Sequence, residues 1–212
     1  MDSDRAAPLA HHFGDLTQQG HAARLGMWLF LGTEVLLFGG LFVGYSVYRY
    51  LFHESFHEAS RHLDTAMGAF DTVILLTSSL FAVLSLHFLR ANRMKLVIAM
   101  LLLTIAMGFG FLVAHGYEYW TEWHEGALPG RYYHLAEVAL PGASMFFVLY
   151  FLMTGLHSLH VIAGVSILGY MTIRAHRGGL TPAYDVPLEI ATLYWHLVDV
   201  IWIFLFPLLY LI

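Results

Sequence analysis

Five long apolar stretches, separated by short polar segments, dominate the chain. They cover about residues 26–48, 67–89, 95–117, 141–172 and 187–211. Each reaches the roughly 20 apolar residues that a helix needs to cross the hydrocarbon core of a membrane. The fourth is longer than a simple crossing requires, so we expect a helix that is tilted or that projects beyond the bilayer. The pattern predicts an all-α integral membrane protein, a bundle of five transmembrane helices.

The first 25 residues differ from the rest because they are polar and contain no apolar core of the kind found in a cleavable signal peptide. We therefore divide the chain into a polar N-terminal segment, residues 1–25, and a transmembrane domain, residues 26–212. The first transmembrane helix is then expected to act as its own uncleaved targeting signal.

Basic residues are distributed unevenly between the two sides of the predicted bundle. A cytoplasmic N-terminus places seven of them on the cytoplasmic side: Arg5, Arg24, Arg90, Arg93, Lys95, Arg174 and Arg177. The opposite side then holds three: Arg49, Arg61 and Arg131. Because Lys and Arg concentrate in cytoplasmic loops, this asymmetry predicts a cytoplasmic N-terminus and, after five crossings, an external C-terminus.

Composition narrows the functional classes. Hydrophobic residues make up 58% of the chain and charged residues 12%, against roughly 25% charged in soluble domains. The net charge of −5 offers no basic patch, so we expect no nucleic-acid partner. The absence of cysteine excludes disulfides, iron–sulfur clusters and thiolate metal sites. The 14 histidines remain to be considered as ligands of haem or metal.

Ionisable residues within the apolar stretches are the main candidates for function. From the helical rise, Glu34 lies ~12 Å from the cytoplasmic edge, and His196 and Asp199 lie roughly 14 and 18 Å from it. His157 and His160 fall in the middle of the fourth stretch. A carboxylate at this depth must be protonated or paired. An imidazole from the fourth or fifth helix could pair with Glu34, so the five residues could share one layer of the bilayer.

Spacing groups these residues further. His157 and His160 are three residues apart, as are His196 and Asp199, and each pair is expected to share a helix face. One hypothesis is a buried polar cluster that keeps the helices in register, binds a lipid headgroup or moves protons. The alternative is a set of separate interhelical hydrogen bonds, each worth about a kcal/mol or less. The sequence alone leaves both hypotheses open.

Other polar and small residues receive structural interpretations. Asp71 lies one turn into the second helix, near the outer interface, and His115 and Glu118 could cap the third helix or contact a neighbouring subunit. Close helix contacts are suggested by Gly40-xxx-Gly44 and by the four-residue spacing of Ala106, Gly110 and Ala114, although glycine is common in membrane helices.

Histidines could in principle hold a metal or haem. Those of the two outer loops show no ligand spacing and are interpreted as solvent-facing: His53, His57, His62, His124 and His134. Within the bundle, His157 or His160 opposite His196 could supply one bis-histidine haem pair. Each of these sites has an adjacent polar partner, however, and no second pair exists. We therefore expect no haem and no metal in this chain.

Three motifs resemble a known family. They are Gly26-Met27-Trp28-Leu29-Phe30-Leu31-Gly32-Thr33-Glu34, Thr154-Gly155-Leu156-His157-Ser158-Leu159-His160-Val161-Ile162-Ala163-Gly164 and Tyr194-Trp195-His196-Leu197-Val198-Asp199-Val200-Ile201-Trp202. In this order they resemble subunit III of haem–copper terminal oxidases of the cytochrome c oxidase type, and the likeness runs from about residue 24 to the C-terminus. The chain is similar to the short, five-helix bacterial form, without the first two of seven helices.

The resemblance implies a non-redox accessory subunit in the bacterial cytoplasmic (inner) membrane. Haem and copper are expected in the partner subunits I and II, and this chain is expected to hold no catalytic, cofactor-binding or metal-ligating residue. The helices would form two groups around a cleft filled with bound phospholipid. The subunit would support the stability and proton uptake of the catalytic subunit during electron transfer to oxygen, and the complex could join a wider respiratory supercomplex.

The resemblance also assigns positions. Glu34 corresponds to the family's buried, carbodiimide-reactive glutamate, and the other matching motif positions are His157, His160, Glu189, His196 and Asp199. One departure is His115, where the family usually has glutamine. The alternatives are a subunit III-like component of a quinol oxidase or nitric oxide reductase and, from another class, an independent b-type cytochrome or transporter.

Overall fold

A computed structural model of the chain describes residues 9–135, 138 and 140–212. Within this part it forms six α-helices and no β-strand: α1 (Leu16–Leu51), α2 (His53–His62), α3 (Thr65–Arg90), α4 (Met94–Glu125), α5 (Ala143–His176) and α6 (Val186–Tyr210), with a short 3-10 turn η1 (Gly130–Tyr132). By length and composition, all five helices other than α2 could span a membrane. The predicted all-α architecture with five membrane helices is confirmed. Arg5, used in the orientation argument, lies outside the described residues.

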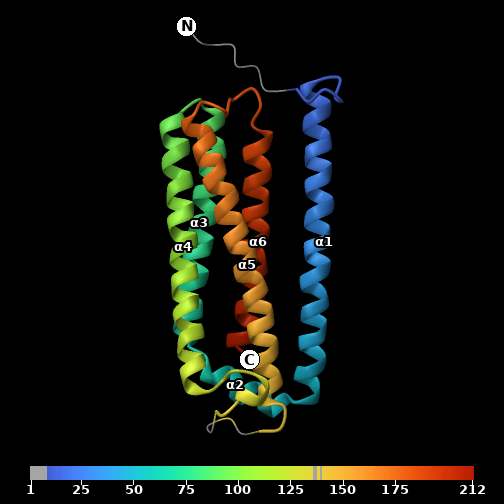
Figure 1. The fold of residues 1–212 in the computed structure, drawn as a ribbon, viewed down its shortest axis with the longest axis vertical. Helices are drawn as coiled ribbons and strands as arrows, with labels where there is room; N and C mark the ends of the chain where they lie inside the picture. The colour runs from blue at the N-terminus through green and yellow to red at the C-terminus, as the bar shows by residue number, and fades with distance from the viewer. Residues whose placement is uncertain (1–8, 136–137, 139) are drawn as a thin grey trace.

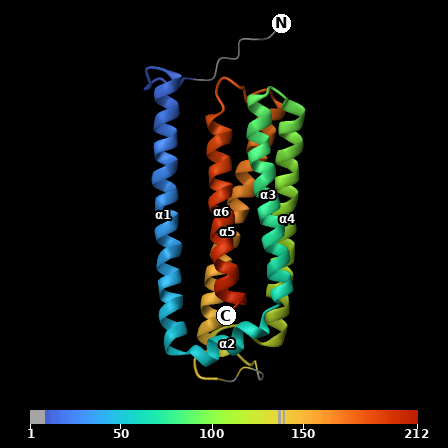
Figure 2. The same cartoon turned by 180° about the vertical axis from the view of Figure 1, so that it is seen from behind.

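The five long helices divide into a four-helix bundle and one peripheral helix. Helices α3, α4, α5 and α6 pack together, α1 stands beside α5 and α6, and α2 crosses one end of the bundle (Figures 1 and 2). In its most apolar segment only 17% of the residues of α1 are buried within the chain, against 50% in α6. Most of α1 is therefore available to lipid or to another subunit.

Two helices extend further than their apolar stretches predict. α1 begins at Leu16, ten residues before the predicted start, because the Asp15 carboxylate caps it by accepting a hydrogen bond from the Gln18 amide at 2.7 Å. α4 continues to Glu125, beyond the predicted end at 117, and ends where Gly126 adopts a left-handed conformation with φ of 85°. Hydropathy marks the membrane portion of a helix, whereas capping residues set its ends.

The outer segment after α1 was expected to be a loop, and this expectation is wrong. Residues 53–62 form α2, whose inner face buries Ser55, Phe56, Ala59 and Ser60. The ring of Phe56 packs edge-on against Tyr45 of α1 and Phe146 of α5, with centroids 5.4 and 5.5 Å apart. This helix is too short and polar to resemble a span, yet its amphipathic face fastens it to the end of the bundle.

Three helices pack closely around Trp195 of α6. A methyl group at Gly108 of α4 would lie 2.7 Å from the indole, and one at Gly164 of α5 would also lie 2.7 Å from it. The indole therefore fills the space that these two glycines leave between three helices. Within the chain, Gly40, Gly44 and Gly110 make no such contact, because a methyl group there would meet no heavy atom within 4 Å. Helical spacing alone cannot distinguish a glycine that faces the bundle from one that faces outward.

The substitutions Gly108→Ala and Gly110→Ala test this packing within one helix. Gly108→Ala is expected to destabilise the bundle by about 1–3 kcal/mol, because the new methyl group overlaps the rigid indole of Trp195. Gly110→Ala is the matched control and should leave the thermal unfolding midpoint unchanged or raise it slightly. Equal midpoints for the two variants would contradict the packing described here.

Candidate functional site

Glu34 of α1 and His160 of α5 form the central polar contact of the transmembrane region. The His160 Nε2 atom lies 2.9 Å from the Glu34 Oε2 atom, and the two side chains are only 14% and 13% exposed. His160 Nδ1 lies 2.8 Å from the Leu156 carbonyl oxygen, which can only accept, so Nδ1 carries a hydrogen. The expected pairing of Glu34 with an imidazole from the fourth span is confirmed.

The number of protons that Glu34 and His160 hold together follows from their hydrogen bonds. With Nδ1 protonated, the contact between Nε2 and the carboxylate needs one further proton, which resides on either partner. In both cases the pair is neutral overall, as the low dielectric of a bilayer requires. Glu34 and His160 can therefore hold one proton and pass it over 2.9 Å without placing a net charge in the membrane.

Polar contacts fasten α1 along its length, mainly to α6. Arg24 donates to the Glu189 carboxylate from Nη2 at 2.8 Å and from Nε at 3.1 and 3.2 Å, and the Tyr45 hydroxyl donates to the Leu208 carbonyl at 2.6 Å. The partners are separated by 165 and 163 residues, so α1 and α6 run parallel in a nearly constant register. Glu189 therefore belongs to the attachment of α1 and is not in contact with Glu34.

His196 and Asp199 of α6 both face Ser79 of α3. The His196 Nδ1 atom lies 2.8 Å from the Ser79 hydroxyl, and the Asp199 carboxyl group interacts with the same side chain. Their predicted common helix face is confirmed. Since this contact lies between α3 and α6, the structure separates it from the Glu34–His160 pair between α1 and α5.

His157 is fully buried and faces a different neighbour from His160. Its ring lies between Phe111 of α4 and Trp202 of α6, with centroid distances of 5.5 and 5.2 Å. The expectation that His157 and His160 act from one face is wrong. Three residues leave an angular offset of about 60° around a helix, enough to direct one ring into the bundle and the other toward α1.

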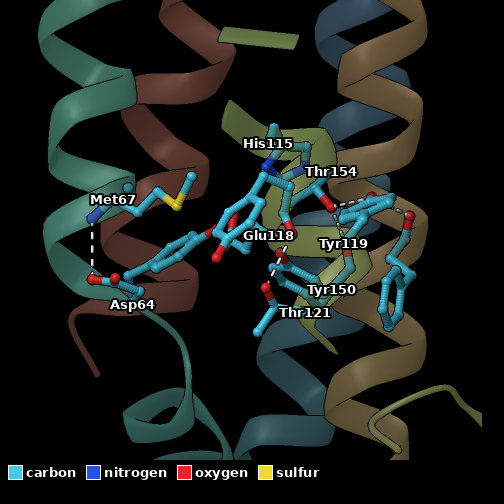
Figure 3. A network of polar contacts seen from close by, with 12 residues as sticks. Asp64, Met67, His115, Glu118, Tyr119, Thr121, Tyr150 and Thr154 are labelled. Atoms are coloured by element: carbon cyan, nitrogen blue, oxygen red, sulfur yellow. Dashed lines mark hydrogen bonds and ion pairs between the residues drawn. The ribbon is translucent and has the colours of Figure 1, made fainter. Parts of the chain in front are cut away.

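A second polar cluster lies inside the four-helix bundle, and the sequence did not predict it. Glu118 of α4 accepts a hydrogen bond from the Tyr210 hydroxyl at 2.9 Å, and its Oε2 atom lies 3.1 Å from His115 Nδ1. Tyr119 contacts the Thr154 hydroxyl of α5 at 2.6 Å. Figure 3 shows His115, Glu118, Tyr119, Tyr150 and Thr154 gathered in the space between the helices.

The interpretations of His115 and Glu118 therefore need correction. These two residues and Asp71 are at most 4% exposed, so His115 and Glu118 neither cap a helix end nor face a neighbouring subunit. Asp71 is completely buried and interacts electrostatically with Glu118, and neither of its oxygens has a hydrogen-bond partner among the described residues. A buried carboxyl in this state requires a proton or a bound water. The spacing His115-x-x-Glu118 was the available signal.

Two apolar grooves flank the contact between α1 and α6. One, of about 330 Å³, is lined by Met27, Phe30, Ala163, Ile167, Met171, Pro187, Ile190, Ala191 and Tyr194. The other, of about 490 Å³, is lined by Trp28, Leu31, Gly32, Val35, Leu36, Leu193, His196, Leu197 and Val200. The polar pairs that hold α1 thus lie beside long apolar surfaces suited to hydrocarbon chains.

Comparison with known proteins gives a consistent result over the whole chain. Residues 7–212 match the family model described as cytochrome c oxidase subunit III. The chain is 31% identical to cytochrome c oxidase subunit 3 of Alkalihalophilus pseudofirmus, over 98% of its own length and 95% of the relative. It is also 31% identical to quinol oxidase subunit 3 of Bacillus subtilis, over 92% and 89% of the two chains. A third relative, cytochrome bo(3) ubiquinol oxidase subunit 3 of Pseudomonas putida, is 31% identical over 91% and 87%.

A double-mutant cycle tests the Glu34–His160 contact. Glu34→Ala and His160→Ala should each lower the thermal unfolding midpoint, because each leaves a half-buried polar partner unsatisfied. The double variant should lose less stability than the two single variants lose together, with a coupling energy of about 1–2 kcal/mol. Val35→Ala, on the exposed neighbouring position, serves as the control. Additive effects of the two substitutions would show that the contact does not contribute to stability.

Proposed function

The chain belongs to the cytochrome c oxidase subunit III family, and on this premise we propose that it is the accessory subunit of a proton-translocating oxidase of the cytochrome c type. As a subunit III of a haem–copper oxidase, it is part of a multi-subunit membrane complex. The finer assignment to cytochrome c as electron donor rests on a cytochrome c oxidase subunit 3 that is matched over 98% of this chain and 95% of the relative. The partners proposed are subunits I and II, which would hold the haem and copper.

The absence of a redox role for this chain is part of the proposal. Three of its membrane-embedded imidazoles are engaged in polar contacts: His160 with Glu34, His196 with Ser79, and His115 with Glu118. His157 is enclosed by the rings of Phe111 and Trp202. These contacts favour a structural and proton-handling role over haem ligation, and they argue against an independent b-type cytochrome.

The attachment of α1 is the observation that carries the proposed mode of action. Helix α1 is held by a few polar pairs and leaves apolar grooves on both sides of its contact with α6. We propose that the acyl chains of phospholipids occupy these grooves, the cleft expected for the family. Arg24 is suited to a lipid phosphate, because its side chain is 37% exposed and its partner Glu189 precedes the groove residue Ile190 in the sequence.

Glu34 then has two connected roles. Its pairing with His160 holds α1 beside α5 and thereby maintains the groove. We propose that the proton shared by the pair can be exchanged with the catalytic subunit. A subunit that keeps lipid and a proton-bearing pair beside its partner would support stability and proton uptake during turnover. The runner-up is the same role in a quinol oxidase, since relatives of equal identity carry that name.

Purification of the oxidase through an affinity tag on this chain tests the proposal. The wild-type preparation should contain haem and copper in fixed ratio to the chain and should oxidise ferrocytochrome c. Glu34→Ala should retain the full haem content but lose bound phospholipid, measured as phosphorus per haem, and should inactivate faster during continuous turnover, because α1 is less firmly held.

Leu37→Ala is the control here, because this exposed residue of α1 lines neither groove and does not belong to the polar pair. Unchanged phosphorus and unchanged inactivation kinetics in Glu34→Ala would refute the role of Glu34. Oxidation of a quinol in place of cytochrome c would select the runner-up, and a tagged chain purified without haem–copper subunits would refute both.

Membrane orientation can be tested because the chain has no cysteine of its own. We propose that the α3–α4 turn and the end of α5 face the cytoplasm, from the excess of basic residues there. His176→Cys should then react with a membrane-impermeant maleimide only in inverted vesicles, and Glu58→Cys only in intact spheroplasts. The reverse pattern would overturn the orientation.

A further inference from the structure

A histidine and two glutamates meet where α2 crosses the end of the bundle. His62 is the last residue of α2, and Glu122 and Glu125 lie in the last turn of α4. His62 Nε2 is 2.8 Å from Glu125 Oε2 and 3.8 Å from Glu122 Oε2. We propose that these three side chains form a binding site for a divalent transition metal, best suited to Zn²⁺. This proposal is independent of the oxidase role of the chain.

The donor atoms have the separation that zinc requires. One imidazole nitrogen and two carboxylate oxygens lie within 4.8 Å of one another. A tetrahedral zinc ion with bonds of about 2.1 Å separates its ligand atoms by roughly 3.4 Å. The two distances from His62 Nε2, 2.8 and 3.8 Å, lie on either side of this value, so small side-chain rotations would complete the geometry. Nitrogen and carboxylate ligands together favour zinc over calcium or magnesium.

The buried Glu122 carboxylate distinguishes this cluster from an ordinary surface ion pair. Glu122 is only 3% exposed, and its Oε2 atom faces His62 without a hydrogen-bond partner among the described residues. A separation of 3.8 Å is too long for a hydrogen bond. A protonated imidazole carries one positive charge, which balances only one of the two carboxylates. A divalent cation bound by a neutral imidazole balances both.

The surrounding helices add to this electrostatic preference. α2 ends at His62 and α4 at Glu125, so both helices present their C-terminal ends to the cluster. The helix dipole is negative at that end and favours a bound cation. The ring of Phe147 packs edge-on against His62 at 6.3 Å and limits its orientation. Glu125 is 46% exposed, which opens one side of the site to water for ion entry and for a fourth ligand.

The sequence shows no ligand spacing among the outer histidines, which were therefore interpreted as solvent-facing. The reason is that His62 and Glu122 are 60 positions apart in the sequence and belong to different helices. Only the pair Glu122-x-x-Glu125 has regular spacing, and a pair of acidic residues alone does not indicate a metal. A bound ion would connect α2 to α4 at the same end of the bundle as the loop after Gly126.

Zinc binding to the purified oxidase complex tests the proposal. The complex is stripped with a chelator, equilibrated with radioactive Zn²⁺ over a concentration series, and measured for bound zinc per chain. The wild-type complex should bind one zinc ion per chain. The Glu125→Gln variant should bind this ion at least about tenfold more weakly, because a direct ligand has been removed. Glu125 is exposed, so this variant should assemble normally, and His62→Gln provides a second measurement.

Matched controls keep the test specific. Glu58→Gln removes an exposed carboxylate from α2, and His124→Gln removes an exposed imidazole from α4. Both variants should bind zinc as tightly as the wild type. Haem and copper contents, measured on the same samples, report assembly of the oxidase separately. Equal zinc affinity in the wild type and Glu125→Gln, or no zinc binding by the wild type, would overturn the metal site without affecting the proposed oxidase role.

Discussion

The structure depends on polar pairs that join helices within the hydrocarbon layer of the membrane. In hydrocarbon, apolar side chains gain little by leaving lipid for another helix, so close packing and interhelical polar contacts must hold the helices together. α1 shows this most clearly, because most of its surface faces outward and its attachment rests on Arg24–Glu189, Glu34–His160 and Tyr45–Leu208. These contacts fix the register of α1 and leave its apolar sides open as grooves.

The four-helix bundle is held together mainly by close packing of side chains. Trp195 fills the space left by Gly108 and Gly164, and Trp202 packs among Phe111, His115 and His157. Buried polar groups, including Asp71 and Glu118, lie within this tightly packed unit. The chain thus combines a closely packed bundle with a peripheral helix, an arrangement that fits the proposed role of holding lipid against a catalytic partner.

The membrane helices were predictable from the sequence because an apolar run long enough to span a bilayer is rare in any other kind of segment. The pairing of Glu34 with an imidazole was also predictable, since a carboxylate at that depth needs a partner. The surroundings of His157 and the complete burial of Asp71 were not predictable, because a bundle-facing and a lipid-facing position can be equally apolar. For the same reason the glycine spacing in the third apolar stretch pointed to Gly110, whereas Gly108 makes the close contact.

The contact between Glu34 and His160 can form only late in the synthesis of the chain. The two residues are separated by 126 positions, so the first helix leaves the ribosome long before its partner helices exist. Until α5, the fourth membrane helix, is inserted, the nascent chain must hold a carboxyl group in the bilayer without its imidazole. The carboxyl group can remain in the bilayer at that stage only in its neutral form. When the later helices dock, the contact with His160 forms and α1 is anchored.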